Sequence, residues 1–190
     1  ELGATDWEQA PGYEAGAAEK AAQTQRAANG VDTLIDHDDR YTPTPALSHA
    51  ILTFNRKHGG GVEADGIVVT PSHNPPQDGG FKYNPPHGGP ADSDATKVIA
   101  AAANDYLRAG LDGVRRTPFA KARAHAQGYD FLGTYVDDLP NVVDLERIKD
   151  AGVRIGADPL GGAAVAYWGE IADRHGLDLT VVNPLVDPTW

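Results

Sequence analysis

The sequence contains no cysteine and no methionine among its 190 residues. Without cysteine, a disulfide framework, a thiolate zinc site and a cysteine nucleophile are all excluded. No apolar run approaches the roughly 20 residues that a membrane-spanning helix needs, and the N-terminus lacks the basic and then apolar pattern of a secretory signal. We therefore expect no membrane partner, and we expect the cytoplasm as the location.

Basic residues are few: 16 Lys and Arg stand against 27 Asp and Glu, which gives a net charge of −11 with neutral histidines. The acidic residues are scattered along the chain. Such a charge repels nucleic-acid phosphates and anionic lipids, so we expect neither as a partner. The 41% hydrophobic and 23% charged residues are typical of a globular protein.

Helical and strand patterns alternate along the chain, which predicts an α/β fold with a mixed or mostly parallel sheet sandwiched by helices. The run Ile67–Val69 is continuous and β-branched, which is typical of a strand buried on both faces. Residues 17–28 have helical propensity, but their apolar positions are nearly all alanine and would bury little area, so we expect a loose or surface segment over residues 1–28. Further strands are predicted over 31–35, 153–156 and 179–182, and helices over 46–56, 96–108, 144–150 and about 164–175.

A break near Pro140 divides the predicted elements into two groups. We expect a first domain over residues 1–143 and the start of a second, similar domain over residues 144–190. The pair Gly161-Gly162 lacks the spacing of a nucleotide-binding loop and predicts a tight turn between a strand and a helix.

The segment after the strand at 67–69 is rich in proline and glycine and places Ser72 at its tip. Lys82 follows ten residues later, after a Gly79-Gly80 turn that lets the chain double back. A serine here has three interpretations: a hydrolase nucleophile, a residue of an ordinary turn, or a carrier of a phosphoryl group. The hydrolase motif G-x-S-x-G is absent, because Thr70 and Asn74 flank the serine, and the residues alone leave the other two open.

Polar residues 36–40 form a second candidate region. The carboxylates of Asp36-His37-Asp38-Asp39 are hard-metal donors, but neighbours in an extended chain point to opposite faces, so we expect a solvated loop. Arg40 precedes the T-P-T-P turn and is a candidate substrate-binding residue. The histidines at 49, 58, 87, 125 and 175 are dispersed, so we do not expect zinc.

Three motifs carry a resemblance to a known family: T-P-S-H-N-P-P at 70–76, D-G-G-F-K-Y-N-P-P at 78–86 and G-G-P-A-D at 88–92. Together they resemble the phosphoserine loop of the α-D-phosphohexomutase superfamily, and are most similar to its bacterial α-glucose-specific phosphoglucomutases. The resemblance extends from about Val31 through T-P-T-P-A-L-S at 42–48 to I-G-A-D-P-L-G-G-A at 155–163.

The resemblance implies that the protein is an enzyme, and it implies a role for each of several residues. Ser72 is expected to carry the transferable phosphate, which also ligates Mg²⁺. His73 and Lys82 are expected to serve proton transfer and phosphate neutralisation as catalytic residues. Asn74 is expected to support the loop and, with Arg40, to bind substrate. The implied reaction interconverts glucose 1-phosphate and glucose 6-phosphate, with glucose 1,6-bisphosphate as intermediate and activator.

Two family features do not occur between Glu1 and Trp190. The metal loop D-x-D-x-D-R is absent, and residues 1–28 do not resemble the family's G-T-S-G-x-R-G segment. We therefore expect these residues to be part of a longer protein. The alternative is a non-catalytic binding or regulatory module that keeps the fold of the mutase's first domain.

Overall fold

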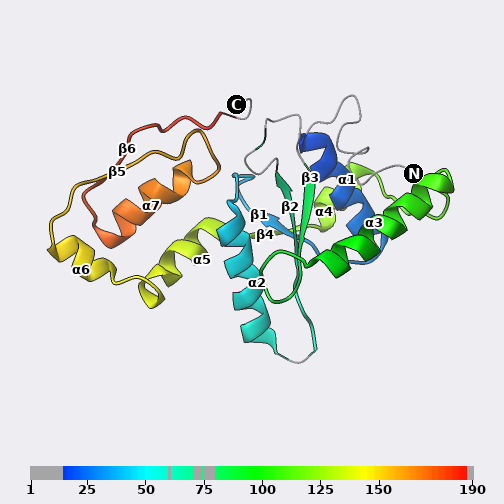
Figure 1. Cartoon of the computed structure of the whole chain (residues 1–190), viewed down its shortest axis with the longest axis horizontal. Coiled ribbons are helices and arrows are strands. Elements are labelled where there is room, and N and C mark those ends of the chain that lie inside the picture. Colours follow the sequence, from blue (N-terminus) through cyan, green and yellow to red (C-terminus); the bar gives the residue numbers. More distant parts are fainter. Residues whose placement is uncertain (1–14, 60, 71–73, 75–79, 188–190) are drawn as a thin grey trace.

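The computed structural model describes residues 15–59, 61–70, 74 and 80–187. Figure 1 shows two groups of elements that meet where α2 and α5 approach each other. We call described residues 15–143 the first unit and residues 144–187 the second unit. The division into domains at 143/144 stays a prediction, and no described helix is both long enough and apolar enough to span a membrane.

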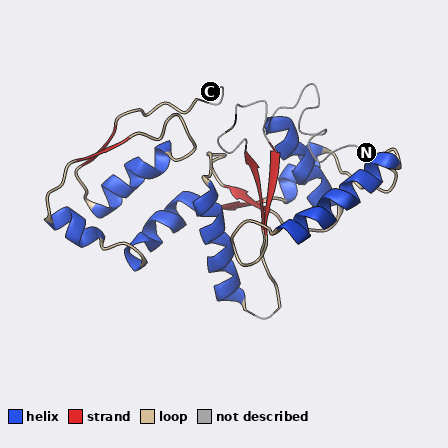
Figure 2. Ribbon diagram, in the orientation of Figure 1, coloured by secondary structure: helices blue, strands red, loops and turns tan. Residues whose placement is uncertain are grey.

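The first unit contains two separate pairs of strands. Strands β1 (Leu34–Asp36) and β4 (Gln127–Tyr129) pair in parallel, and β2 (Gly66–Thr70) and β3 (Gly80–Asn84) pair antiparallel. In Figure 2 these strands lie between α2 on one side and α1 with α4 on the other. The helices of this unit are α1 (Ala15–Ala28), α2 (Thr44–His58), α3 (Ser93–Arg108), α4 (Phe119–His125) and α5 (Phe131–Asp138), followed by the 3₁₀ helix η2 (Leu139–Asn141).

The second unit contains one parallel pair of strands, β5 (Ile155–Ala157) and β6 (Leu179–Val181). The helix α7 (Val165–His175) connects them and packs against β6, and the helix α6 (Leu145–Asp150) precedes them. Gly161 lies in the turn between β5 and α7 with a φ of 74°, and a side chain at Gly162 would approach the Pro159 carbonyl oxygen at 3.0 Å. The predicted tight turn is confirmed. The mixed α/β architecture expected from the sequence is confirmed as well.

Local sequence explains where several helices begin and end. The carboxylate of Asp92 accepts hydrogen bonds from the backbone N–H groups of Asp94 and Ala95 and so caps α3. Pro45 occupies the first turn of α2, where a missing N–H costs nothing, and Gly59 follows its last residue. The helix predicted over 46–56 is therefore present and extends by two residues at each end.

Three expectations about individual segments are wrong. Residues 15–28 form a helix packed against α4, with Ala22 and Gln23 buried, because small alanines allow close approach. Strand β2 is not buried on both faces, since Ile67 is 36% exposed. The expectation of a solvated loop over 36–39 fails at Asp36, which ends β1 and is 8% exposed, whereas residues 37–39 are exposed.

The most continuous core lies where the two units meet. Ala46 of α2, Leu132 and Val136 of α5, and Tyr167 of α7 form one buried cluster. Helix α5 packs against α2 on one side and α7 on the other, as Figure 1 shows. The junction between the units is therefore a packed hydrophobic contact.

Candidate functional site

The candidate phosphoserine loop connects two paired strands. In the antiparallel pair, Thr70 at the end of β2 stands opposite Gly80 at the start of β3. Ser72 and His73 lie between these two residues and outside the described part of the chain. Asn74 is described and exposed. The pairing fixes both ends of the loop at neighbouring positions of one two-stranded ladder.

Lys82 lies on the strand that returns from this loop. It stands opposite Val68, which is four residues before Ser72 in the sequence. Side chains of a strand alternate between its faces, so Lys82 shares its face with Asn84, whose side chain reaches Ser48 of α2. Lys82 is exposed, and no carboxylate of the described residues forms an ion pair with it. Its ammonium is thus available to an anion.

Two asparagines attach the strands of the hairpin to α2. The buried Asn84 donates from Nδ2 to the Gly88 carbonyl oxygen at 2.9 Å. Asn55 of α2 donates from Nδ2 to the carbonyl oxygens of Ala64 and Pro86, each at 2.9 Å. Its Oδ1 accepts the N–H of Ala64 at 2.6 Å. These contacts hold the approach to β2 and the exit from β3, at the end of the ladder where Gly66 stands opposite Asn84.

Arg40 lies beyond the carboxyl end of β1, at an edge where open α/β sheets commonly bind ligands. Its Nε and Nη2 donate to Oδ1 and Oδ2 of Asp36 at 3.1 and 3.2 Å. Its Nη2 also donates to Oδ1 of Asp130 at 3.0 Å. All three guanidinium nitrogens therefore lie near carboxylates, since Nη1 is 3.7 Å from Oδ2 of Asp38.

Asp36 is the buried centre of these contacts. Burial by itself raises the pKa of its carboxyl group, but hydrogen bonds from the Arg40 side chain and from the backbone N–H groups of Arg40 and Asp38 outweigh burial. The pKa therefore lies below its ordinary value of 3.8, and the group is a carboxylate at neutral pH. Asp130 was not singled out from the sequence, although an Asp immediately before the apolar Phe131-Leu132 is a helix-start signal.

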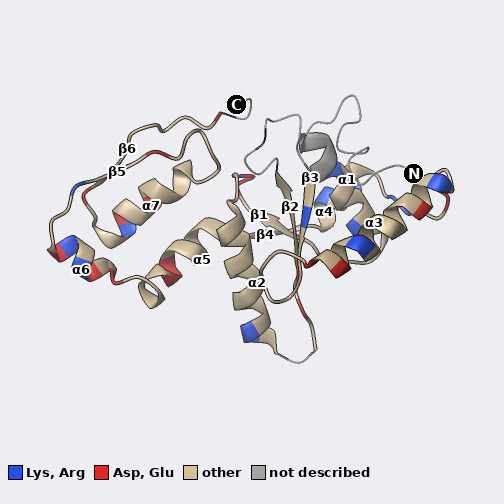
Figure 3. Ribbon diagram, viewed as in Figure 1, with Lys and Arg blue, Asp and Glu red and all other residues tan. Residues whose placement is uncertain are grey.

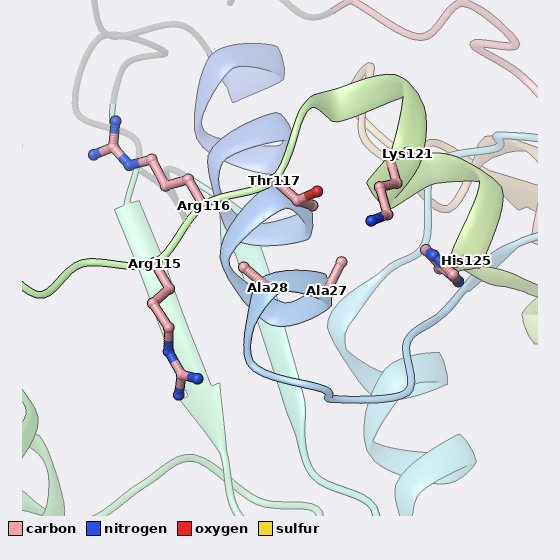
Figure 4. Close-up of a pocket in the computed structure, with 7 residues that line it drawn as sticks. All are labelled: Ala27, Ala28, Arg115, Arg116, Thr117, Lys121 and His125. Carbon is pink, nitrogen blue, oxygen red and sulfur yellow. The ribbon is translucent and has the colours of Figure 1, made fainter.

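A basic hollow of about 440 Å³ lies beside the end of α1. Figure 4 shows Arg115 and Arg116 extending to opposite sides of their loop, so their guanidinium groups do not converge. Cations near the last turn of a helix complement its dipole, which accounts for their position beside α1. The lining residues are Ala27, Ala28, Arg115, Arg116, Thr117, Lys121 and His125.

Metal donors are not grouped in the described part of the chain. No set of three His, Asp or Glu side chains there is arranged to hold an ion. Acidic residues are distributed over both units, as Figure 3 shows.

Comparison with known proteins matches this chain to a protein family. Residues 13–109 match the family model described as phosphoglucomutase/phosphomannomutase, alpha/beta/alpha domain I. The chain is 55% identical over 173 residues to a phosphoglucomutase of Komagataeibacter xylinus, covering 90% of this chain and 31% of that protein. It is 45% identical over 187 residues to phosphoglucomutase 1 of Saccharomyces cerevisiae, covering 85% of this chain and 32% of that protein.

A solved structure has the same fold as this chain. Pp63/parafusin, a phosphoglucomutase from Paramecium, matches with a TM-score of 0.67 at 21% identity, covering 93% of this chain and 35% of that one. The chain thus spans about a third of the length of the relatives it matches. The family model covers more than half of the 190 residues, and the chain belongs to the phosphoglucomutase/phosphomannomutase family.

Proposed function

We propose that the intact protein is a phosphoglucomutase that interconverts glucose 1-phosphate and glucose 6-phosphate. The observation that carries this proposal is the T-P-S-H-N-P-P loop, which joins two paired strands in a chain of this family. The names of the relatives support glucose phosphates as the substrate class. On this proposal Ser72 holds the phosphoryl group that is exchanged.

The reaction requires two phosphoryl transfers that balance. In the first, the phosphorus–oxygen bond at Ser72 breaks, and the free hydroxyl oxygen of the sugar monophosphate forms a new bond to phosphorus. The proton of that hydroxyl passes to a neighbouring base, for which we propose the imidazole of His73. In the second, the bond between the other phosphate and its sugar oxygen breaks, the Ser72 oxygen forms a bond to that phosphorus, and the proton passes from the base to the released sugar oxygen.

Positioning and charge stabilisation are the main contributions of a protein to phosphoryl transfer. Lys82 is proposed to neutralise charge on the transferring phosphate, because its exposed ammonium lies on the strand that leaves the loop. Asn74 is proposed to support the loop. Direct contact between Arg40 and substrate stays a prediction.

Magnesium dependence is part of the proposal. A phosphoryl oxygen on Ser72 is the hard ligand that Mg²⁺ prefers, and the bound ion would offset phosphate charge. The described residues supply no cluster of protein donors around such an ion. We therefore assign the metal one proposed ligand, the phosphorylated Ser72.

The decisive experiment is the Ser72→Ala variant of the intact protein. We expect it to lose turnover of glucose 1-phosphate and to lose transfer of labelled phosphate from glucose 1,6-bisphosphate onto the protein. Ser93→Ala removes an exposed hydroxyl at the start of α3 and serves as the matched control. Near-normal turnover in Ser72→Ala would refute the role of Ser72. A wild-type protein that neither turns over nor takes up label would favour the binding or regulatory module.

A further inference from the structure

The side chain of Asp130 connects the first parallel strand pair to the start of α5. Its Oδ1 accepts the Gly133 N–H at 2.9 Å, which caps the helix, and accepts Nη2 of Arg40 at 3.0 Å. A Cβ atom at position 133 would stand 2.1 Å from Asp130 Oδ2, so only glycine leaves room for this carboxylate. The bridge joins residues that are 90 positions apart in the sequence.

Arg40 is anchored from its other side by Asp36. Besides its two side-chain hydrogen bonds, Asp36 Oδ1 accepts the backbone N–H of Arg40 at 3.1 Å and that of Asp38 at 3.0 Å. The Asp36 side chain is only 5% exposed, and a charge so deeply buried requires a paired cation. We call Asp36, Arg40 and Asp130 the polar bridge.

Helix α5 connects the polar bridge to the second unit. Its residues Leu132 and Val136 pack with Tyr167 of α7, which is 3% exposed. The Tyr167 hydroxyl is buried and has no hydrogen-bond partner among the described residues. One polar contact also joins α5 to α7, because His175 Nε2 lies 2.9 Å from the Val136 carbonyl oxygen. The ion pair between Asp137 and Arg174 is exposed, and such pairs contribute little.

Burial is the main influence on the ionisation of the Tyr167 phenol. Burial raises the pKa of the Tyr167 phenol to about 12, with smaller effects of both signs from Thr42, Asp36, Arg40 and Asp130. The neutral form of the phenol is held firmly at all physiological pH values.

We propose that the polar bridge fixes the orientation of the second unit against the first, and that Arg40 acts as a positioning residue through Asp130 and α5. The bridge lies just before the T-P-T-P turn that leads into α2, so it holds α2 and α5 in one arrangement. The effect on catalysis rests on the proposed function, whereas the effect on the junction does not.

The experiment compares two conservative variants of the intact protein by amide hydrogen exchange. Asp130→Asn keeps an oxygen acceptor for the helix cap and removes the charge that Arg40 contacts. Arg40→Lys keeps the positive charge and loses the planar group that contacts two carboxylates at once. We expect each to accelerate exchange in α7 about tenfold, and the double variant to add no more than about twofold, because both remove one bridge.

A matched control is available on the same helix. Asp137→Asn removes one carboxylate of α5 from an exposed ion pair with Arg174, and exposed pairs contribute little. We expect less than about a twofold change in the exchange of α7 for this variant. Acceleration confined to residues 36–40 in both bridge variants would overturn the proposal, and so would an equal effect of the control.

Kinetics with glucose 1-phosphate separate a positioning residue from a substrate contact. If Arg40 positions the units, Arg40→Lys and Asp130→Asn should lower kcat by a similar factor, about tenfold, and keep KM within about twofold. A rise in KM of more than about tenfold in Arg40→Lys alone would instead identify a substrate contact and overturn the positioning role. If the wild type lacks mutase activity, the proposed function is wrong. Hydrogen exchange in α7 then still tests whether the polar bridge orients the second unit.

Discussion

Lys82 and Val68 are cross-strand partners in the antiparallel pair β2–β3. This register places Lys82 on the strand that leaves the candidate phosphoserine loop. It lies directly opposite the buried Val68 on the strand that enters the loop. A loop closed by such a pair has little freedom at its two ends. A cation there can therefore be pre-positioned for a phosphate before any substrate binds.

Replacing Lys82 by alanine should lower kcat of the intact protein by about two to three orders of magnitude, because charge stabilisation of the transferring phosphate is lost. The fold should survive, since the side chain is exposed. Steady-state turnover of glucose 1-phosphate measures the effect. Lys97→Ala, on the exposed surface of α3, is the control and should retain the wild-type rate. An unchanged rate in Lys82→Ala would mean that Lys82 takes no part in catalysis.

Gly88 should be intolerant of a side chain, because it sits between β3 and α2 with a φ of 78°. A Cβ there would stand 2.9 Å from Leu52 Cγ and 3.0 Å from the Ser48 carbonyl oxygen. Gly110 has a similar φ of 65° but nothing within 4 Å, so Gly110→Ala is a control for the backbone conformation alone. We expect Gly88→Ala to lower the free energy of unfolding by about 1–3 kcal/mol more than Gly110→Ala. Urea denaturation tests this, and equal losses would contradict it.

The stability of the protein should fall in acid through carboxylates that the fold keeps ionised. Hydrogen bonds lower the pKa of Asp36 against the opposing effect of burial, and the contact with His49 lowers the pKa of Asp138. A carboxyl whose folded pKa is depressed stabilises the fold above its unfolded pKa, and this contribution disappears as the pH falls through the folded pKa. Stability should therefore decline below the ordinary value of 3.8.

The Asp36→Asn variant tests this pH dependence directly. It should be less stable than wild type at pH 7, and its unfolding free energy should fall less steeply between about pH 4 and pH 2, because one depressed carboxyl is gone. Urea unfolding at a series of pH values measures both. A slope as steep as that of the wild type would show that Asp36 contributes nothing to the acid transition.

Much of the architecture followed from local sequence patterns. Helix α2 was predicted because Leu47, Ala50, Ile51 and Phe54 recur at helical spacing, and its observed buried residues include Ala50 and Ile51. The elements of the second unit were predicted to within about three residues, since their apolar runs are bounded by glycine or charged residues. These signals depend only on near neighbours in the sequence.

Other elements had no comparable local signal. Helix α1 was missed as a packed element because alanines bury little area individually, although they allow a neighbouring helix to approach closely. Strand β3 was missed because Phe81-Lys82-Tyr83 is short and lies within a glycine- and proline-rich segment. The partners of Arg40 include Asp130, and no spacing rule relates residues so far apart.

The two units should unfold together, because their shared core lies at the junction. Leu132 is 4% exposed and packs in the cluster that includes Ala46 of α2 and Tyr167 of α7. Leu132→Ala leaves a cavity there and should cost about 2–5 kcal/mol. We expect amide exchange to accelerate in α2 and in α7 alike, since each loses the same neighbour.

The control for this prediction is Leu145→Ala. Leu145 is 7% exposed at the start of α6 and lies outside the junction cluster, so its truncation should affect the second unit and leave exchange in α2 unchanged. If Leu132→Ala instead accelerated exchange in only one unit, the two would be independent folding units joined by a simple linker. Faster exchange in both units would identify α5 as an element that they share. A boundary at 143/144 would then divide two similar folds that still depend on one common core.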